Sequence, residues 1–151
     1  MTLATNQVRA GVDTTTVPAG PLPFLRWDPN LASYAAAWAA QCISSNGQLL
    51  DHDPNRTNVA GYQYIGENIF AAGGSATAQA AVDLWAAEKS FYDYATNTCA
   101  SGHTCGHYTQ LVWRTTLNVG CALHACPSLA YPNTIVCDYG PGGNFGGQPP
   151  Y

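Results

Sequence analysis

The chain has 151 residues, a formal net charge of -4 at pH 7 and only 9% charged residues, far below the roughly 25% of an average globular protein. This length suits one domain, 1–151, with a single core, and a hydrophobic content of 46% excludes a disordered chain. The absence of a basic excess argues against nucleic acid and against an anionic membrane surface as partners. Low charge with many small polar residues and tyrosines is typical of an extracellular protein.

The first seven residues, M-T-L-A-T-N-Q, contain neither the charged nor the apolar region of a signal peptide. If the protein is secreted, we therefore expect the chain to be a mature form with an added Met1. No run approaches the ~20 apolar residues of a membrane span, so no transmembrane segment is expected. Asn55-Arg56-Thr57 matches a glycosylation sequon.

Two helices are predicted in the first third of the chain. A short helix is expected over residues 6–12, followed by a loop rich in Thr, Pro and Gly that reaches Pro23. Asp28 and Pro29 have the character of an N-cap and a first helical residue. Apolar residues then recur at helical spacing up to Cys42, before Ser-Asn-Gly at 45–47 ends the helix.

A further helix is predicted from about Ser75 to Tyr92, and two short apolar segments, 117–125 and 134–139, are bounded by turn residues as strands are. Residues 140–151, rich in Gly and Pro, are expected to form an ordered coil over the core. Because the predicted helices and strands do not follow a regular β-α-β order along the chain, the pattern favours an α+β domain or an α/β/α sandwich.

The cysteines form an even set with no CxxC pair, which favours a disulfide framework in an oxidising compartment over a zinc ribbon or a redox site. They are Cys42, Cys99, Cys105, Cys121, Cys126 and Cys137. Six cysteines allow fifteen pairings, and spacing alone does not choose among them.

The chain has only two glutamates, and each has an unusual position. Glu88 lies on the apolar stripe of the predicted helix, three residues after Trp85. Glu67 lies between Ile65 and Ile69, so in an extended segment all three side chains share a face. A buried carboxylate must be paired or coordinated. The alternative is two surface glutamates, each near a charge such as Lys89.

Histidines are the natural partners of these carboxylates. His52 has acidic neighbours in D-H-D-P-N, and His107 follows Gly106 at the start of an apolar element; the alternative for both is a surface or capping role. His103 and His124 are expected to be ordinary exposed histidines. Two His and two Glu together would form a divalent-metal site for Zn²⁺, Cu²⁺ or Ni²⁺, with waters completing the coordination and modest affinity.

Familiar hydrolase motifs are missing from the sequence. There is no H-E-x-x-H and no G-x-S-x-G, which argues against a zinc metallopeptidase and a serine hydrolase. Cysteine catalysis is not expected if all six thiols are bridged.

Four motifs resemble those of the CAP superfamily, the secreted cysteine-rich group that includes plant pathogenesis-related proteins and insect venom antigens. G-H-Y-T-Q-L-V-W at 106–113 and I-V-C-D-Y-G-P-G-G-N-F at 135–145 match its two signatures. G-E-N-I at 66–69 and W-A-A-E-K-S-F-Y-D-Y at 85–94 resemble its two glutamate motifs. The likeness covers nearly the whole chain and is closest to the plant and fungal pathogenesis-related type.

This resemblance implies a three-layer α-β-α sandwich with a large cleft and a tetrad whose two histidines can hold a metal. The tetrad is His52, Glu67, Glu88 and His107. The implied disulfides are Cys42–Cys126, Cys99–Cys105 and Cys121–Cys137. The chain departs from the family pattern at Thr5, where many relatives have His, at Asp138, where Asn is common, and at Gly140, where plant relatives often have Asp.

The resemblance favours a secreted, monomeric module that binds a sterol or another small lipid and acts in defence or host–microbe contact. A metal-dependent hydrolase that uses Glu67 or Glu88 as general base is the first alternative. The second alternative is a precursor that releases the C-terminal peptide 141–151. The opposing interpretation is that this segment is a tail fixed to the domain for stability. An enzyme is thus the less favoured class.

Overall fold

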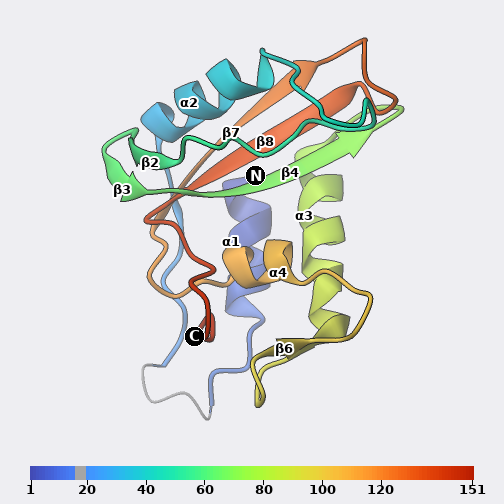
Figure 1. Ribbon diagram of the computed structural model, residues 1–151. Coiled ribbons are helices and arrows are strands. Elements are labelled where there is room, and N and C mark those ends of the chain that lie inside the picture. Colours follow the sequence, from blue (N-terminus) through green and yellow to red (C-terminus); the bar gives the residue numbers. More distant parts are fainter. Residues whose placement is uncertain (16–19) are drawn as a thin grey trace.

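The computed structural model describes residues 1–15 and 20–151, so part of the predicted loop up to Pro23, at 16–19, lies outside the described residues. A four-stranded sheet forms the middle layer, in the order β1 (Arg26–Trp27), β7 (Asn118–Ala125), β8 (Asn133–Gly140) and β4 (Gly66–Ala72). Helix α2 (Pro29–Ala39) covers one face, and α1 (Thr2–Ala10), α3 (Ala78–Ala87) and α4 (Gly106–Leu111) cover the other (Figure 1). The predicted α+β class and three-layer sandwich are confirmed.

The remaining elements are short. Strands β2 (Thr57–Val59) and β3 (Tyr62–Tyr64) form one hairpin, and β5 (Tyr92–Asp93) and β6 (Thr98–Cys99) form another. A 3-10 helix, η1 (Glu88–Phe91), follows α3 directly. No helix in the described part of the chain is both long and apolar enough to cross a membrane.

The sheet is buried on both faces. In the sheet β7 and β8 pair antiparallel, as do β8 and β4, whereas β1 runs parallel to β7. One apolar core fills the space under α1, α3 and α4, and a second lies under α2 around Trp38. Strand β8 lies between these cores and is buried from Thr134 to Gly140, which explains why the predicted strand 134–139 is so apolar.

Helix α2 begins as predicted and ends earlier than predicted. The Asp28 carboxylate accepts hydrogen bonds from the N–H groups of Asn30 and Leu31, and Pro29 follows it. The helix ends at Ala39 because the chain turns there, with Cys42 in the left-handed region at φ 50°. Gly120 on β7 lets the helix approach the sheet, since a Cβ there would lie 2.1 Å from Ala32 N.

Two other helix boundaries differ from the predictions. The opening helix spans Thr2–Ala10 instead of 6–12. The helix predicted from Ser75 to Tyr92 begins after Thr77, whose hydroxyl caps it, and ends at Ala87, where the backbone tightens into η1. Both strand predictions agree with β7 and β8 to within one residue at each end.

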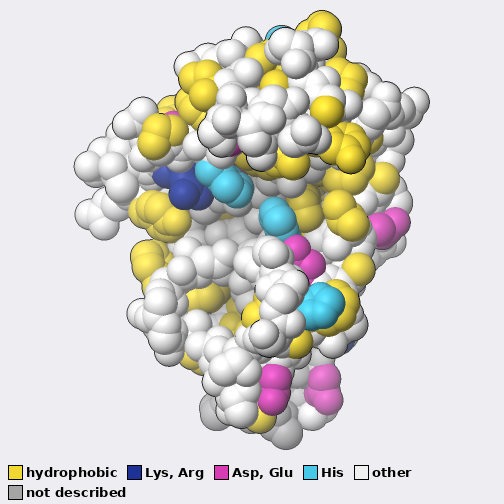
Figure 2. All heavy atoms as spheres, turned by 45° about the vertical axis from the view of Figure 1, so that its right-hand side comes forward, with side chains coloured by type: hydrophobic (Ala, Val, Ile, Leu, Met, Phe, Trp, Pro, Cys, Tyr) yellow, Lys and Arg dark blue, Asp and Glu magenta, His cyan; other side chains and the backbone are white. Residues whose placement is uncertain are grey.

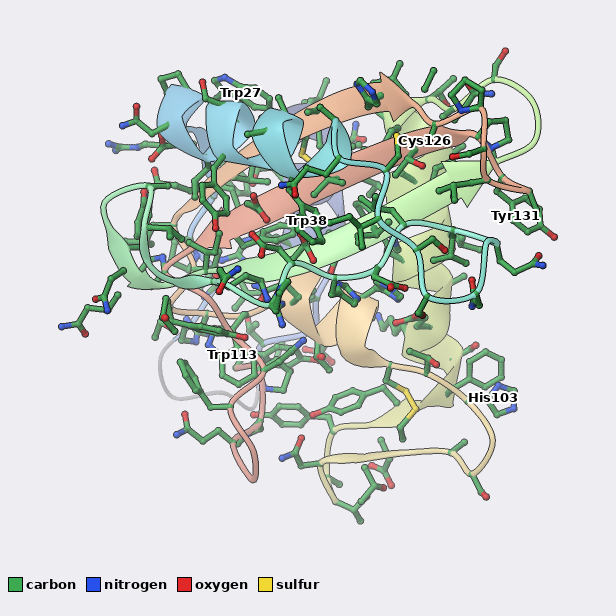
Figure 3. The ribbon with its side chains drawn as sticks, turned by 45° about the horizontal axis from the view of Figure 1, so that its top comes forward. Trp27, Trp38, His103, Trp113, Cys126 and Tyr131 are labelled. Atoms are coloured by element: carbon green, nitrogen blue, oxygen red, sulfur yellow. A yellow bond between two sulfur atoms is a disulfide. The ribbon has the colours of Figure 1, made fainter. Side chains whose placement is uncertain are left out.

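The structure contains three disulfides, with the pairing that the family resemblance implies: Cys42–Cys126, Cys99–Cys105 and Cys121–Cys137. Cys42–Cys126 joins the segment after α2 to the end of β7, and Figure 3 shows Cys126 beside that end of the helix. Cys121–Cys137 links directly paired residues of β7 and β8. Cys99–Cys105 closes the loop that leads into α4.

Candidate functional site

The first half of the site is a pair formed by His52 and Glu67. Glu67 lies on β4, is only 7% exposed, and faces His52 in the loop after α2. Its Oε1 atom lies 2.5 Å from His52 Nδ1 and also accepts the N–H of Asp53 at 3.1 Å. Since a carboxylate can only accept, Nδ1 carries the proton. A buried carboxylate thus orients an imidazole whose side chain is 52% exposed.

The second half is formed by His107 and Glu88. Glu88 Oε1 lies 2.6 Å from His107 Nδ1, and Oε2 accepts the N–H groups of His107 and Tyr108, each at 3.0 Å. Glu88 therefore orients the imidazole and satisfies two free N–H groups at the start of α4. Because α3 ends at Ala87, Glu88 does not lie in the buried helical stripe: its side chain is 16% exposed.

Asn68 connects the two pairs. It follows Glu67 on β4, and its side-chain N–H₂ donates to the backbone carbonyl of His107 at 3.1 Å. Asn68 is almost fully buried, so this contact fixes the start of α4 against the sheet. No periodicity in the sequence singles out Asn68, and the one signal for its role is its position directly after Glu67 in G-E-N-I.

His52 and His107 line one cleft of about 270 Å³. Figure 2 shows histidine side chains close together in a hollow of the surface, with a basic side chain beside them. The other lining residues are mostly polar: Arg56, Tyr64, Glu67, Asn68, Thr104, Gly106 and Asn144. Across the described ranges, neither histidine makes a hydrogen bond through Nε2. Each imidazole can therefore offer an Nε2 lone pair to a ligand in this cleft.

The chemistry of these two donors suits a divalent metal ion. Histidines that bind metals usually donate their second ring N–H to a carboxylate, which fixes the tautomer and makes the imidazole more basic. Both histidines have this contact. Imidazole nitrogen suits Zn²⁺, Cu²⁺ or Ni²⁺, and two such ligands leave positions open for water or a bound molecule.

Comparison with known proteins identifies the family. Residues 3–139 match the model of the CAP family, described as the cysteine-rich secretory protein family. The chain belongs to this family. It is 43% identical to pathogenesis-related protein 1A from Nicotiana tabacum over 128 residues, which are 84% of this chain and 69% of that protein. It is also 42% identical over 137 residues to GLIPR1-like protein 1 from Homo sapiens, covering 89% of this chain.

The CAP domain is shorter than some of these relatives. It spans 55% of the human and 59% of the Bos taurus GLIPR1-like protein 1. Among solved structures it resembles Schistosoma mansoni venom allergen-like protein 4, with a TM-score of 0.76, 29% identity and coverage of 99% of this chain and 89% of that one. It also resembles NaASP2, solved with Zn²⁺, with a TM-score of 0.70, 26% identity and coverage of 99% and 82%.

Asp138 adds an unusual carboxyl group behind the tetrad of this CAP domain. It lies directly opposite Glu67 in the β4–β8 pair and is only 1% exposed. Within the described residues, neither of its oxygens has a hydrogen-bond partner, and neither has Glu67 Oε2. Burial, followed by the negative charges of Glu67 and Asp53, raises the pKa of Asp138 to about 8. The group is therefore mostly protonated at pH 7.

The other two histidines lie outside the cleft. His103 is exposed and stacks on Phe91 with ring centroids 3.6 Å apart, and Figure 3 shows it at the edge of the molecule. His124, predicted to be exposed, is half-buried, because it packs near the Cys42–Cys126 disulfide. The two sulfurs and a His124 nitrogen lie within 4.8 Å of one another, but bridged sulfurs have no thiolate to offer a metal.

The C-terminal segment 141–151 is tied to the domain along its length. Near its start, Gly142 N–H donates to the Tyr64 carbonyl, and Gly143 N–H donates to the side chain of Gln110. Near its end, the Pro150 carbonyl accepts the N–H of Arg114, and Tyr151 stacks on Tyr94 with ring centroids 4.6 Å apart. These contacts favour a structural tail over a peptide held for release.

Proposed function

We propose that this CAP domain is a secreted binding module of defence or host–microbe contact, and that its cleft binds one divalent ion, such as Zn²⁺, through Nε2 of His52 and His107. The observation that carries the proposal is that both imidazoles are held through Nδ1 by a carboxylate and line the same cleft. The Zn²⁺-containing structure of NaASP2, a relative with the same fold, supports it. Three disulfides are consistent with an oxidising, extracellular compartment.

Binding is favoured over hydrolysis by the contacts of the two glutamates. A metal-dependent hydrolase needs a carboxylate free to take a proton from a metal-bound water. Glu88 uses both of its oxygens for His107 and the start of α4. The accepting oxygen of Glu67 is engaged with His52 and Asp53, and its other oxygen is buried beside Asp138. Both carboxylates thus position imidazoles.

The metal proposal predicts a specific loss of zinc affinity. Replacing His107 with alanine removes one of two protein ligands, and we expect zinc affinity to fall at least tenfold in a chelator-competition titration. Glu67→Ala removes the acceptor that orients His52, and a loss of roughly 10–100-fold is expected. His103→Ala is the matched control, because His103 lies outside the cleft. Equal zinc affinity in the His107→Ala and His103→Ala variants would contradict the site.

We further propose that a sterol or similar small lipid binds at a second place, around Phe24. The metal cleft has polar walls, which do not suit an apolar ligand. Phe24, in contrast, is 63% exposed and lies between two grooves of about 360 and 500 Å³. The first groove includes Val12 and Leu22, and the second includes Leu25 and Leu117. The first groove, whose walls are mainly apolar with a few polar groups, suits the flat body and single hydroxyl of a sterol.

The lipid proposal predicts saturable sterol binding that depends on Phe24. In a radiolabelled sterol titration, Phe24→Ala should weaken binding several-fold, because an aromatic side chain gives much of the contact area in such sites. Leu123→Ala is the matched control: Leu123 is 62% exposed and lies on β7 outside both grooves. Absence of saturable binding, or an equal effect of the two substitutions, would refute this second proposal without affecting the metal site.

A further inference from the structure

Arg56 lies in the same cleft as the two histidines, although neither family motif nor periodicity points to it. It immediately precedes β2, is half-buried, and lines the cleft with His52 and His107. Its guanidinium carbon lies 6.0 Å from the centre of the Tyr64 ring, within the range of a cation–π contact. Figure 2 shows a basic side chain beside the histidines of this hollow. The Tyr64 ring therefore holds a cation at the wall of the proposed metal site.

The remaining arginines have other places in the fold. Arg9 is buried and donates to the backbone carbonyls of Leu111 and Trp113. Arg114 donates to two backbone carbonyls near residue 20. Arg26 lines the groove at β1 instead of the cleft. In a chain with a net charge of -4, Arg56 is thus the one Lys or Arg that lines the cleft among the described residues.

The carboxyl groups near Arg56 form no ion pair with it among the described residues. The two ion pairs recorded for the described residues both join a histidine to a glutamate, and neither includes Arg56. Glu67 is engaged with His52 and Asp53. Asp138, whose charge would interact with Arg56, has a pKa raised to about 8 by burial and by Glu67 and Asp53, so it is mostly neutral at pH 7. A divalent ion at the histidines would add two positive charges to a cleft that is lined by one arginine and one glutamate.

We propose that the cleft binds a phosphate monoester, with one phosphate oxygen on the metal ion held by His52 and His107 and the others accepting hydrogen bonds from Arg56. This inference rests on the proposed metal site. Three terminal oxygens can serve the ion and a planar, two-pronged guanidinium at once. The hydroxyls of Tyr64 and Thr104 line the same cleft and can donate to the phosphate. A cleft of about 270 Å³ has room for this group and a small substituent.

The test is a calorimetric titration of the zinc-loaded protein with glycerol 3-phosphate. Wild type is expected to bind, and Arg56→Gln should weaken binding about tenfold or more, since a charged, two-pronged donor is lost. Arg26→Gln, which changes an arginine outside the cleft, should bind as wild type does. Binding should also weaken at least tenfold when zinc is removed, because the ion supplies one of the two positive partners.

The outcomes separate the two proposals. If wild type does not bind zinc in the absence of phosphate, the proposed metal site fails. If zinc binds equally to wild type and Arg56→Gln but glycerol 3-phosphate does not distinguish them, the phosphate inference fails and the metal site stands. Equal affinity of the protein for glycerol 3-phosphate with and without zinc would also contradict the inference, because it would show that the metal ion does not bind the phosphate together with Arg56.

A second arm separates a free phosphate monoester from one on a lipid. Flotation of the zinc-loaded protein with phosphatidylcholine vesicles, with and without phosphatidic acid, presents the same group on a membrane surface. Binding to phosphatidic acid that depends on Arg56, together with weak binding of glycerol 3-phosphate, assigns the site to a lipid headgroup. Binding of glycerol 3-phosphate alone assigns it to a soluble ligand. Binding of neither probe by the zinc-loaded protein overturns the inference.

Discussion

Replacing both Cys42 and Cys126 with alanine is expected to lower the free energy of unfolding by about 4 kcal/mol in the chain-entropy account of disulfide stabilisation. The two cysteines are 84 residues apart, so their bond restricts a long loop of the unfolded chain. Cys99 and Cys105 are only 6 residues apart, and removing that bond should cost about 2 kcal/mol. Urea unfolding followed by tryptophan fluorescence measures both.

The two disulfides make a matched comparison. Each contains one buried cysteine, Cys126 or Cys105, and one more exposed partner. Cys42 and Cys126 also pack in the core around Trp38, so the loss of packing adds to the effect of loop length in their double variant. Equal losses of stability would show that loop closure does not determine the contribution of the Cys42–Cys126 bond.

Asp138→Asn is expected to raise the free energy of unfolding by roughly 1–3 kcal/mol at pH 8. Both Asp138 oxygens are buried without a hydrogen-bond partner among the described residues, opposite the equally unpartnered Oε2 of Glu67. An asparagine of the same shape carries no charge and can donate an N–H to that oxygen. The resemblance to the CAP family points the same way, because Asn is common at this position.

The raised pKa of Asp138 determines how its contribution to stability changes with pH. The pKa of Asp138 is raised from its ordinary value of 3.8 to about 8 in the folded protein, by burial and by the charges of Glu67 and Asp53. Between these values the folded state holds a proton that the unfolded state has lost, so the Asp138 contribution to stability falls as pH rises. Relative to Asp138→Asn, wild type should lose up to about 1.4 kcal/mol per pH unit in this window.

Urea titrations at pH 5, 6, 7 and 8 measure this slope. Asp83→Asn is the control, since Asp83 is exposed on α3 and lies away from the buried pair of Asp138 and Glu67. Parallel pH profiles for wild type and Asp138→Asn would contradict the account of Asp138 as a buried, protonated acid.

The two glutamates show which features of the site local sequence patterns can predict and which they cannot. The alternation of Ile65, Glu67 and Ile69 places the three side chains on one face only if the segment is extended, and the structure shows that Glu67 and Ile69 lie in the buried strand β4. Helical spacing selects Glu88 as unusual, but the helix ends at Ala87, and Glu88 lies in η1 with its carboxylate at the start of α4. That contact joins residues 19 and 20 positions apart, and helical periodicity contains no information about it.

The partners of the site residues depend on strand register and loop positions. Asp138 faces Glu67 only because β4 and β8 pair in one particular register, which no local pattern predicts. Arg56 and Asn68 are polar residues without periodicity, and their roles follow from the placement of β2 and α4 around one cleft. The short hairpins β2–β3 and β5–β6 are absent from the sequence predictions, because strands of two or three residues are too short to show alternation.

The disulfide pairing shows what the family resemblance adds. Spacing leaves every pairing open, and the resemblance implies the three bonds that the structure contains. The resemblance likewise implies that the two histidines meet, while the structure adds that each Nδ1 is held by a glutamate.

A crystal structure of the protein soaked with Zn²⁺, with anomalous data collected at the zinc edge, tests whether His52 and His107 bind a metal ion together. We expect one strong anomalous peak in the cleft, about 2.0–2.1 Å from Nε2 of both His52 and His107, with both Nδ1–carboxylate contacts kept. A peak at His103 or His124 alone, or no peak in the cleft at a zinc concentration that saturates the protein, would contradict it.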